Sequence, residues 1–96
     1  MEDKNLAFSL PVMIFKQGSR FVGYTPALDI STSGKTETEA RARFVELATL
    51  FFEEIEEAGT TNAVLSELGW TKVQKKWTPP QVISSQSVAF RAPAFA

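Results

Sequence analysis

Carboxylates supply most of the chemistry available to this 96-residue chain, because it contains neither histidine nor cysteine. The commonest general base, the commonest zinc ligand and the thiolate nucleophile are therefore missing. A cluster of acids can still bind Mg²⁺ and support two-metal hydrolysis, as in ribonuclease H-like enzymes. Asp29 is the first candidate ligand, and the acids that follow it are Glu37, Glu39 and Glu46.

Most acids, however, fall where a helix surface is predicted, including Glu53, Glu54, Glu56 and Glu57. A solvated helix face explains them better than a metal site, so we expect no metal ion and no cofactor. The run Gly34-Lys35-Thr36 is similar to the end of a phosphate-binding loop. The loop's first glycine would stand five residues before Gly34, where Asp29 is found instead, so a turn and a helix cap are favoured.

Basic and aromatic residues gather in one segment near the end of the chain. Three lysines and two tryptophans there have the types that contact phosphates and stack on bases: Lys72, Lys75, Lys76, Trp70 and Trp77. The chain as a whole carries a formal net charge of -1 and a pI of about 5.4, which is not the charge of a typical nucleic-acid binder. A strand with a polar outer face is the favoured interpretation, and nucleic-acid binding stays an alternative.

The first half of the chain predicts three strands. Residues 6–16 place four apolar side chains on one face of a strand, namely Phe8, Leu10, Val12 and Ile14. A turn at 17–20 leads to a second strand at 21–24, which together form a hairpin. Residues 27–31 alternate Leu28 and Ile30 with polar residues, which predicts a short third strand that contains Asp29.

A long helix is the strongest structural prediction. Thr36 and Glu39 have the spacing of a capping box, and Gly59 is a natural end. The apolar residues between them follow a helical period in two stripes, the first of Ala40, Phe44, Leu47, Phe51, Ile55 and Ala58 and the second of Val45, Ala48 and Phe52. The first stripe is expected to pack on the sheet. Val45 and Phe52 are expected to meet a partner subunit or a second sheet.

The last third predicts a short helix, a strand and a tail. Thr60 or Thr61 is expected to cap the helix, which runs to Leu68 and ends at Gly69. Residues 70–77 predict a fourth strand at a sheet edge. Residues 79–96 form a tail that either adds a short strand at 81–84 or 87–91 or folds as an arm onto a partner. The expected organisation is thus one domain over residues 1–78, followed by the tail.

Composition and hydropathy fit a small cytoplasmic protein. The chain is 44% hydrophobic and 22% charged, which is ordinary for a globular domain of this length. The N-terminus opens with acidic residues where a secretory signal would be basic. No apolar stretch approaches the roughly 20 residues that a membrane-spanning helix needs.

The segment FVGYTPALDISTSGKT, residues 21–36, is followed by ETEA and the long helix. This order resembles the N-terminal domain of HicB-family antitoxins over roughly residues 12–70. The residues that carry the resemblance are Tyr24, Pro26, Leu28, Gly34, Thr36, Glu39 and Ala40. Leu68-Gly69-Trp70 is similar to a short HicB-like subgroup.

The resemblance implies an α+β fold of the truncated ribonuclease H-like type, without catalytic carboxylates. Three or four antiparallel strands would pack under one long helix in the order β-β-β-α-α-β. The implied role is to bind and mask a small ribonuclease toxin of the HicA type, with the chain itself forming a homodimer or a higher homo-oligomer. Many members add a C-terminal DNA-binding domain, but the 19 residues after Trp77 cannot encode a helix-turn-helix. Direct DNA binding is therefore not expected.

The resemblance also suggests a surface for the toxin. Tyr24, Pro26 and Trp70 would anchor the partner, and the acidic run would attract a basic, RNA-binding protein through Glu53, Glu54, Glu56 and Glu57. No catalytic residue is expected. Two other functions stay open: a metal-dependent nuclease that uses Asp29, and an orphan nucleic-acid-binding domain that uses Lys72, Lys75, Lys76 and the tryptophans.

Overall fold

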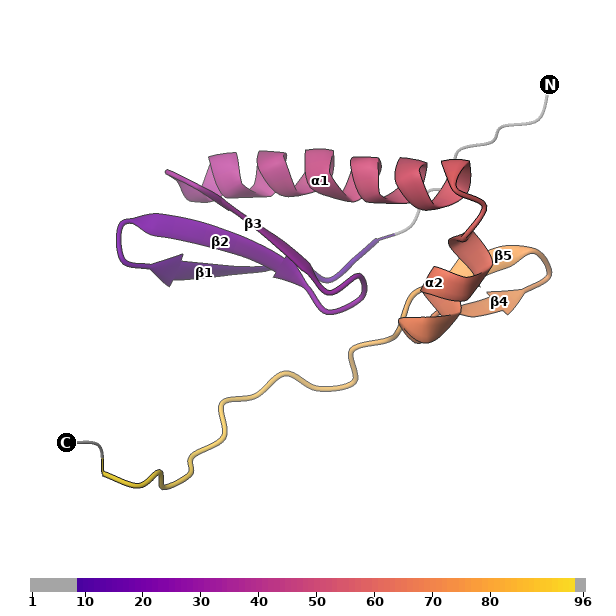
Figure 1. Ribbon diagram of the computed structural model, residues 1–96. Helices are drawn as coiled ribbons and strands as arrows, with labels where there is room; N and C mark the ends of the chain where they lie inside the picture. Colours follow the sequence, from indigo (N-terminus) through magenta and orange to yellow (C-terminus); the bar gives the residue numbers. More distant parts are fainter. Residues whose placement is uncertain (1–8, 95–96) are drawn as a thin grey trace.

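The structure is a computed structural model that describes residues 9–94. Strands β1 (Met13–Gln17), β2 (Arg20–Thr25) and β3 (Ile30–Gly34) form an antiparallel sheet in the order β1-β2-β3. Helix α1 (Glu37–Glu57) covers one face of this sheet (Figure 1). Helix α2 (Thr61–Glu67) and a hairpin of β4 (Thr71–Val73) and β5 (Lys76–Thr78) follow. The predicted α+β class, with a small sheet packed by one long helix, is confirmed.

The β1–β2 hairpin was predicted correctly, but β1 is shorter than expected. Gln17 pairs with Arg20, so the loop is Gly18-Ser19, and Gly18 has the positive φ (59°) that the first position of a two-residue loop favours. The strand begins at Met13 rather than at residue 6. Leu10 and Val12 are half-buried against the core without pairing in the sheet, while Phe8 lies outside the described residues.

The third strand starts three residues later than predicted. Residues 26–29 form a turn in which Ala27 N donates to Thr25 Oγ1 (3.2 Å) and Asp29 N donates to the Thr25 carbonyl (2.9 Å). Asp29 adopts a left-handed φ of 54° and lies in the turn, not in a strand. The turn packs two side chains into the core, since Ala27 and Leu28 are almost fully buried. This burial accounts for the apolar alternation that predicted a strand.

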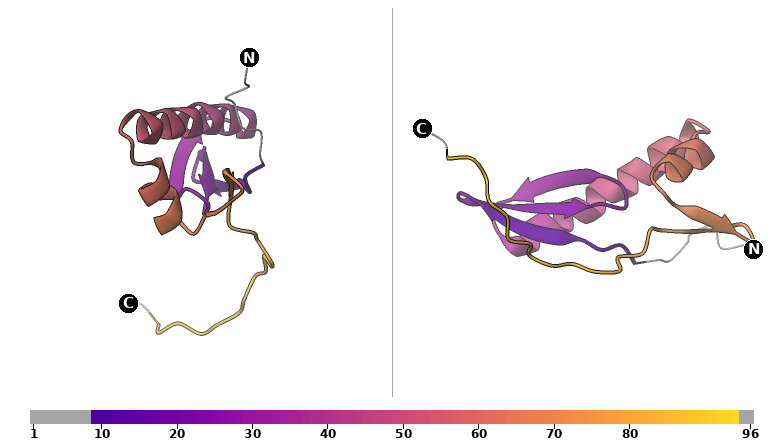
Figure 2. Two further views of the ribbon diagram at one scale, coloured as in Figure 1. Left: turned by 90° about the vertical axis from the view of Figure 1, so that its right-hand side faces the viewer. Right: turned by 90° about the horizontal axis from the view of Figure 1, so that it is seen from below.

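The two faces of the sheet have different surroundings. A Cβ at Gly23 would contact the Ala40 carbonyl at 3.5 Å, so Gly23 faces α1. Side chains alternate along a strand, which places Val22 and Tyr24 on the opposite face. Phe15 pairs with Val22 and Met13 with Tyr24 on that face. We call these four side chains (Met13, Phe15, Val22 and Tyr24) the open face, because no helix of the described residues covers it (Figures 1 and 2).

Helix α1 begins and ends as predicted. Thr36 is the N-cap, and its Oγ1 accepts from Glu39 N at 3.0 Å. The Glu39 carboxylate accepts from Lys35 N (3.2 Å) instead of from the N-cap amide of an ideal capping box. The helix ends before Gly59, whose φ is 71°. Its buried residues are Ala40, Phe44, Ala48 and Ile55.

Two of the apolar positions predicted for α1 are exposed. Ala58 is exposed at the C-cap, where the helix has already ended. Val45 is 60% exposed, while Phe52 is half-buried against the core. The core cluster consists of Ala27, Leu28, Phe44, Ala48, Ile55, Leu65 and Trp70. It therefore joins the turn after β2, residues of α1 from both predicted stripes, and the α2 region.

The predicted fourth strand at 70–77 is wrong as a single strand. Gln74 and Lys75 both have positive φ (52° and 67°), as the two-residue loop of a type I′ hairpin requires. They split the segment into β4 and β5, which pair with each other and not with the main sheet. Within residues 9–94, the tail from residue 79 forms no strand, and no helix is long and apolar enough to span a membrane.

Candidate partner-binding surface

The seven residues expected to bind a partner lie in three separate places. Trp70 is in the core: it is 4% exposed, and its Nε1 donates to the Ala27 carbonyl at 2.8 Å. Its ring meets the edge of Phe52 with centroids 5.9 Å apart. This hydrogen bond connects the end of α2 to the turn at 26–29. Trp70 is therefore not at the surface. It holds the turn that contains Pro26 through its hydrogen bond to Ala27.

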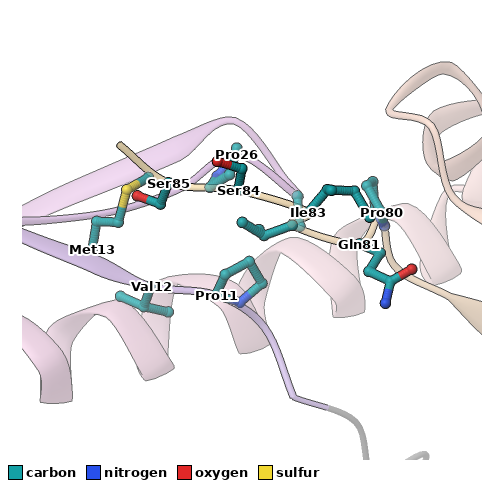
Figure 3. A pocket seen from close by; sticks show the side chains of 11 residues that line it. Pro11, Val12, Met13, Pro26, Pro80, Gln81, Ile83, Ser84 and Ser85 are labelled. Carbon is teal, nitrogen blue, oxygen red and sulfur yellow. The ribbon is translucent and has the colours of Figure 1, made fainter. Parts of the chain in front are cut away.

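Tyr24 and Pro26 lie together at one end of the open face. The Tyr24 hydroxyl donates to Asp29 Oδ1 at 3.0 Å across the turn. This hydrogen bond raises the pKa of Tyr24 above 10.0, with smaller contributions from desolvation and from the negative charge of Asp29. Pro26 is exposed and lines a shallow groove of about 700 Å³ with Pro11, Met13 and the start of the tail (Figure 3).

The Tyr24–Asp29 hydrogen bond makes a testable prediction about titration. Asp29→Asn is expected to lower the Tyr24 pKa toward 10, because the carboxylate that favours the protonated phenol is removed. Asparagine also tolerates the left-handed backbone. Because Tyr24 is the only tyrosine, absorbance near 295 nm during a pH titration reports it alone. In the wild type, the stabilisation from this bond is complete below pH 10 and is lost as pH rises through the folded-state pKa. Identical titration curves for the two proteins would contradict the assignment.

The four expected glutamates lie on α1, on the side of the molecule away from the open face. With 3.6 residues per turn, Glu53 and Glu57 point opposite to the buried Ile55, whereas Glu54 and Glu56 lie on opposite flanks. The same helical period places Glu46 and the 54%-exposed Leu50 on the same solvent-facing side of α1 as Glu53 and Glu57. We call Glu46, Leu50, Glu53 and Glu57 the acidic ridge. The sequence-based set missed Glu46 and Leu50, although the spacing i, i+4, i+7, i+11 identifies them.

The acidic ridge lies in the most acidic part of the chain. Residues 44–67 contain six glutamates and no lysine or arginine, whereas the rest of the chain contains all ten basic residues and five acids. Among the described residues, the ion pairs on α1 are Glu37–Arg41 and Glu39–Arg43, so no basic side chain neutralises the ridge. Negative charge near a helix C-terminus is also unfavourable for the helix dipole. This arrangement costs stability and suits a basic partner.

The residues expected for a metal-dependent nuclease and for a nucleic-acid-binding domain do not come together in one site. Asp29 accepts the Tyr24 hydrogen bond in its turn, and no group of three or more metal-ligating side chains converges anywhere within the described part of the chain. Lys72, Lys75 and Lys76 are exposed on the β4–β5 hairpin, with the Lys72 ammonium 5.5 Å from the half-buried Trp77 ring. Trp70 lies in the core, so its ring is not exposed beside these lysines.

Comparison with protein-family models, with curated proteins and with solved structures finds no match for this chain. The candidate surface is therefore described by its own geometry: an acidic ridge on the outer side of α1, and an apolar open face on the far side of the sheet.

Proposed function

We propose that this chain is a non-catalytic protein-binding domain of the HicB antitoxin type, on a truncated ribonuclease H-like fold. Its partner is a small basic ribonuclease of the HicA type, which it masks. The observation that carries the proposal is the acidic ridge, four exposed helix positions that include three glutamates, none of which forms an ion pair with the described residues. The resemblance of residues 21–40 to the HicB signature supports the same class of partner.

The mechanism is electrostatic capture followed by steric masking. A ribonuclease must carry positive charge to hold the RNA phosphates. The ridge presents carboxylates to that charge and competes with RNA for the same surface, while Leu50 adds an apolar contact near the centre of the ridge. Long-range attraction speeds the encounter, and the rigid helix fixes the spacing of the charges.

The seven residues expected to bind the partner lie in three separate places, so only the glutamates among them are proposed to contact it. Glu53 and Glu57 contact the partner directly, with Glu46 added and with Glu54 or Glu56 on one flank only. Tyr24 and Pro26 lie on the other side of the sheet, so one compact partner on the ridge does not reach them. Trp70 acts through the fold, because its indole positions the turn that carries Pro26.

A co-expression experiment tests the proposed function. The proposal requires a small basic protein encoded beside the gene for this chain; that protein is induced alone in a bacterial host, and it is then induced together with this chain. We expect growth arrest in the first case and normal growth in the second. Continued arrest despite soluble, folded expression of this chain would overturn the proposal, and so would a neighbouring protein that has no effect on growth.

A further inference from the structure

The tail from residue 81 exposes an unusual amount of apolar side chain. Every described residue from 81 to 94 is exposed, and the large apolar members are Val82, Ile83, Val88 and Phe90, between 50% and 84% exposed. Arg91 is the only charged residue among them. We call residues 81–94 the arm. Figures 1 and 2 show it leaving the domain after the β4–β5 hairpin and ending well away from the sheet.

The open face and β1 expose the other main apolar surface. Met13 is 37% and Phe15 is 47% exposed, and β1 is an edge strand whose outer side pairs with no strand among the described residues. An edge strand with apolar side chains is a ready site for pairing with an extended segment. Together, β1 and the arm carry six of the nine large hydrophobic side chains that are exposed in the described part of the chain.

The root of the arm already lies beside β1. Pro80 to Ser85 form one wall of the groove of about 700 Å³, and Pro11 to Met13 with Pro26 and Ala27 form the other (Figure 3). The two walls stand apart, so the arm does not fill the groove of its own domain. An extended segment that entered between them would continue along β1.

We propose that the arm of one copy lies on β1 and the open face of a second copy, and that the two copies exchange arms around a two-fold axis. Both surfaces are present on every chain, so one symmetric exchange covers both arms and both open faces. The 14 residues of the arm and the 5 of β1 give 19 residues per copy, which is close to the lower end of the roughly 20 to 30 per side of a stable interface. The acidic ridge, on the other side of the sheet, stays free.

The arm is long enough for this exchange. At about 3.3 Å per residue, 14 extended residues span roughly 46 Å, whereas the five residues of β1 span roughly 17 Å. The alternation of Val82, Ser84, Gln86, Val88 and Phe90 with the intervening residues places Val88 and Phe90 on the same side of an extended chain. Those two side chains are expected to contact Phe15 and Met13 of the second copy.

Sedimentation velocity on the full-length chain tests the exchange, across concentrations from about 1 to 100 μM. We expect the wild type to sediment as a dimer. Val88→Ser/Phe90→Ser is expected to weaken dimerisation by at least about a hundredfold, because four buried side chains per dimer are lost. Phe15→Ser, which changes the receiving face, is expected to act in the same direction. The control is Val45→Ser, a 60%-exposed apolar residue on α1 and away from the open face, which is expected to leave an arm-exchanged dimer intact.

A mixing experiment separates exchange between copies from folding of the arm onto its own sheet. When the arm variant is mixed with Phe15→Ser, the heterodimer regains one intact contact between an arm and an open face. We therefore expect more dimer in the mixture than in either variant alone. A monomeric wild type, or a dimer that the arm substitutions do not change, would overturn the proposal. Circular dichroism verifies that each variant is folded, and the result is independent of whether any toxin binds.

Discussion

Trp70→Ala is expected to destabilise the fold by about 3–5 kcal/mol, the usual cost of removing a buried tryptophan. The indole is 4% exposed, donates to the Ala27 carbonyl and contacts Phe52. The substitution leaves a cavity in the core and an unpaired carbonyl in the turn at 26–29. Since a small domain has roughly 5–15 kcal/mol of stability in total, much of the population is expected to unfold. Urea unfolding followed by circular dichroism measures the change.

Two phenylalanine variants identify the source of this effect. Trp70→Phe keeps a ring but removes the N–H donor, so a loss of roughly 2 kcal/mol is expected from the unsatisfied carbonyl and the smaller side chain. Trp77→Phe is the matched control, because Trp77 is half-buried on the hairpin and the Lys72 ammonium lies over its ring. We expect that change to cost under about 1 kcal/mol. Equal losses for Trp70→Phe and Trp77→Phe would show that Trp70 has no special structural role.

Gly34→Ala is expected to lower stability by about 1–3 kcal/mol or more, through a clash between β3 and the first turn of α1. A Cβ at this position would lie 2.6 Å from Ala40 N and 3.0 Å from the Glu39 carbonyl carbon. Both are backbone atoms, so no side-chain rotation relieves the contact and the strand must move away from the helix. A melting temperature lower by roughly 5–20 °C is expected from a domain of this size.

Gly23→Ala provides the control for this prediction. Gly23 also faces α1 from the neighbouring strand, but an added Cβ would meet its nearest atoms at 3.5 Å, which is ordinary contact. The two substitutions therefore add the same methyl group against the same helix and differ in the room available. We expect Gly23→Ala to be nearly neutral. Similar melting temperatures for the two variants would contradict the close packing of Gly34.

The long helix and the hairpin could be predicted from local signals. The Thr36 cap, Gly59 and the helical period fix α1 without any long-range contact, and Gly18 fixes the β1–β2 turn. The turn at 26–29 could not be predicted in this way, because Leu28 alternates with polar residues as it would in a strand. The turn is held by the hydrogen bond from Trp70 to the Ala27 carbonyl, and these two residues are 43 positions apart in the sequence. Only the folded chain reveals that contact.

The hairpin at 71–78 was hidden for a different reason. Lysine and glutamine rarely occupy left-handed positions, yet Gln74 and Lys75 do so here, so the sequence shows no turn signal.

The candidate surface could likewise be predicted only in part from the sequence. Helical spacing along α1 could have identified the acidic ridge in full, but the distance between the ridge and Tyr24 depends on which face of the sheet α1 covers. In the folded chain, α1 lies on the side of the sheet that Gly23 faces.

The two surfaces give the domain separate binding sides. The acidic ridge faces outward from α1 and is proposed for a basic partner. The open face lies beyond the sheet and is proposed for the arm of a second copy. A dimer built by arm exchange would therefore present two acidic ridges and could bind two partners at once. Such an arrangement raises the effective concentration of each ridge when the partners are linked.

The affinity of the chain for the proposed basic ribonuclease partner tests the acidic ridge most directly. Glu53→Lys and Glu67→Lys change the net charge equally and both replace exposed helical glutamates, but only Glu53 lies on the ridge. At about 0.15 M salt, where long-range effects are screened within roughly 8 Å, Glu53→Lys is expected to weaken binding at least about tenfold. Glu67→Lys is expected to change the affinity less than about twofold. Equal effects of the two variants, or unchanged affinity in both, would contradict the ridge as the binding surface.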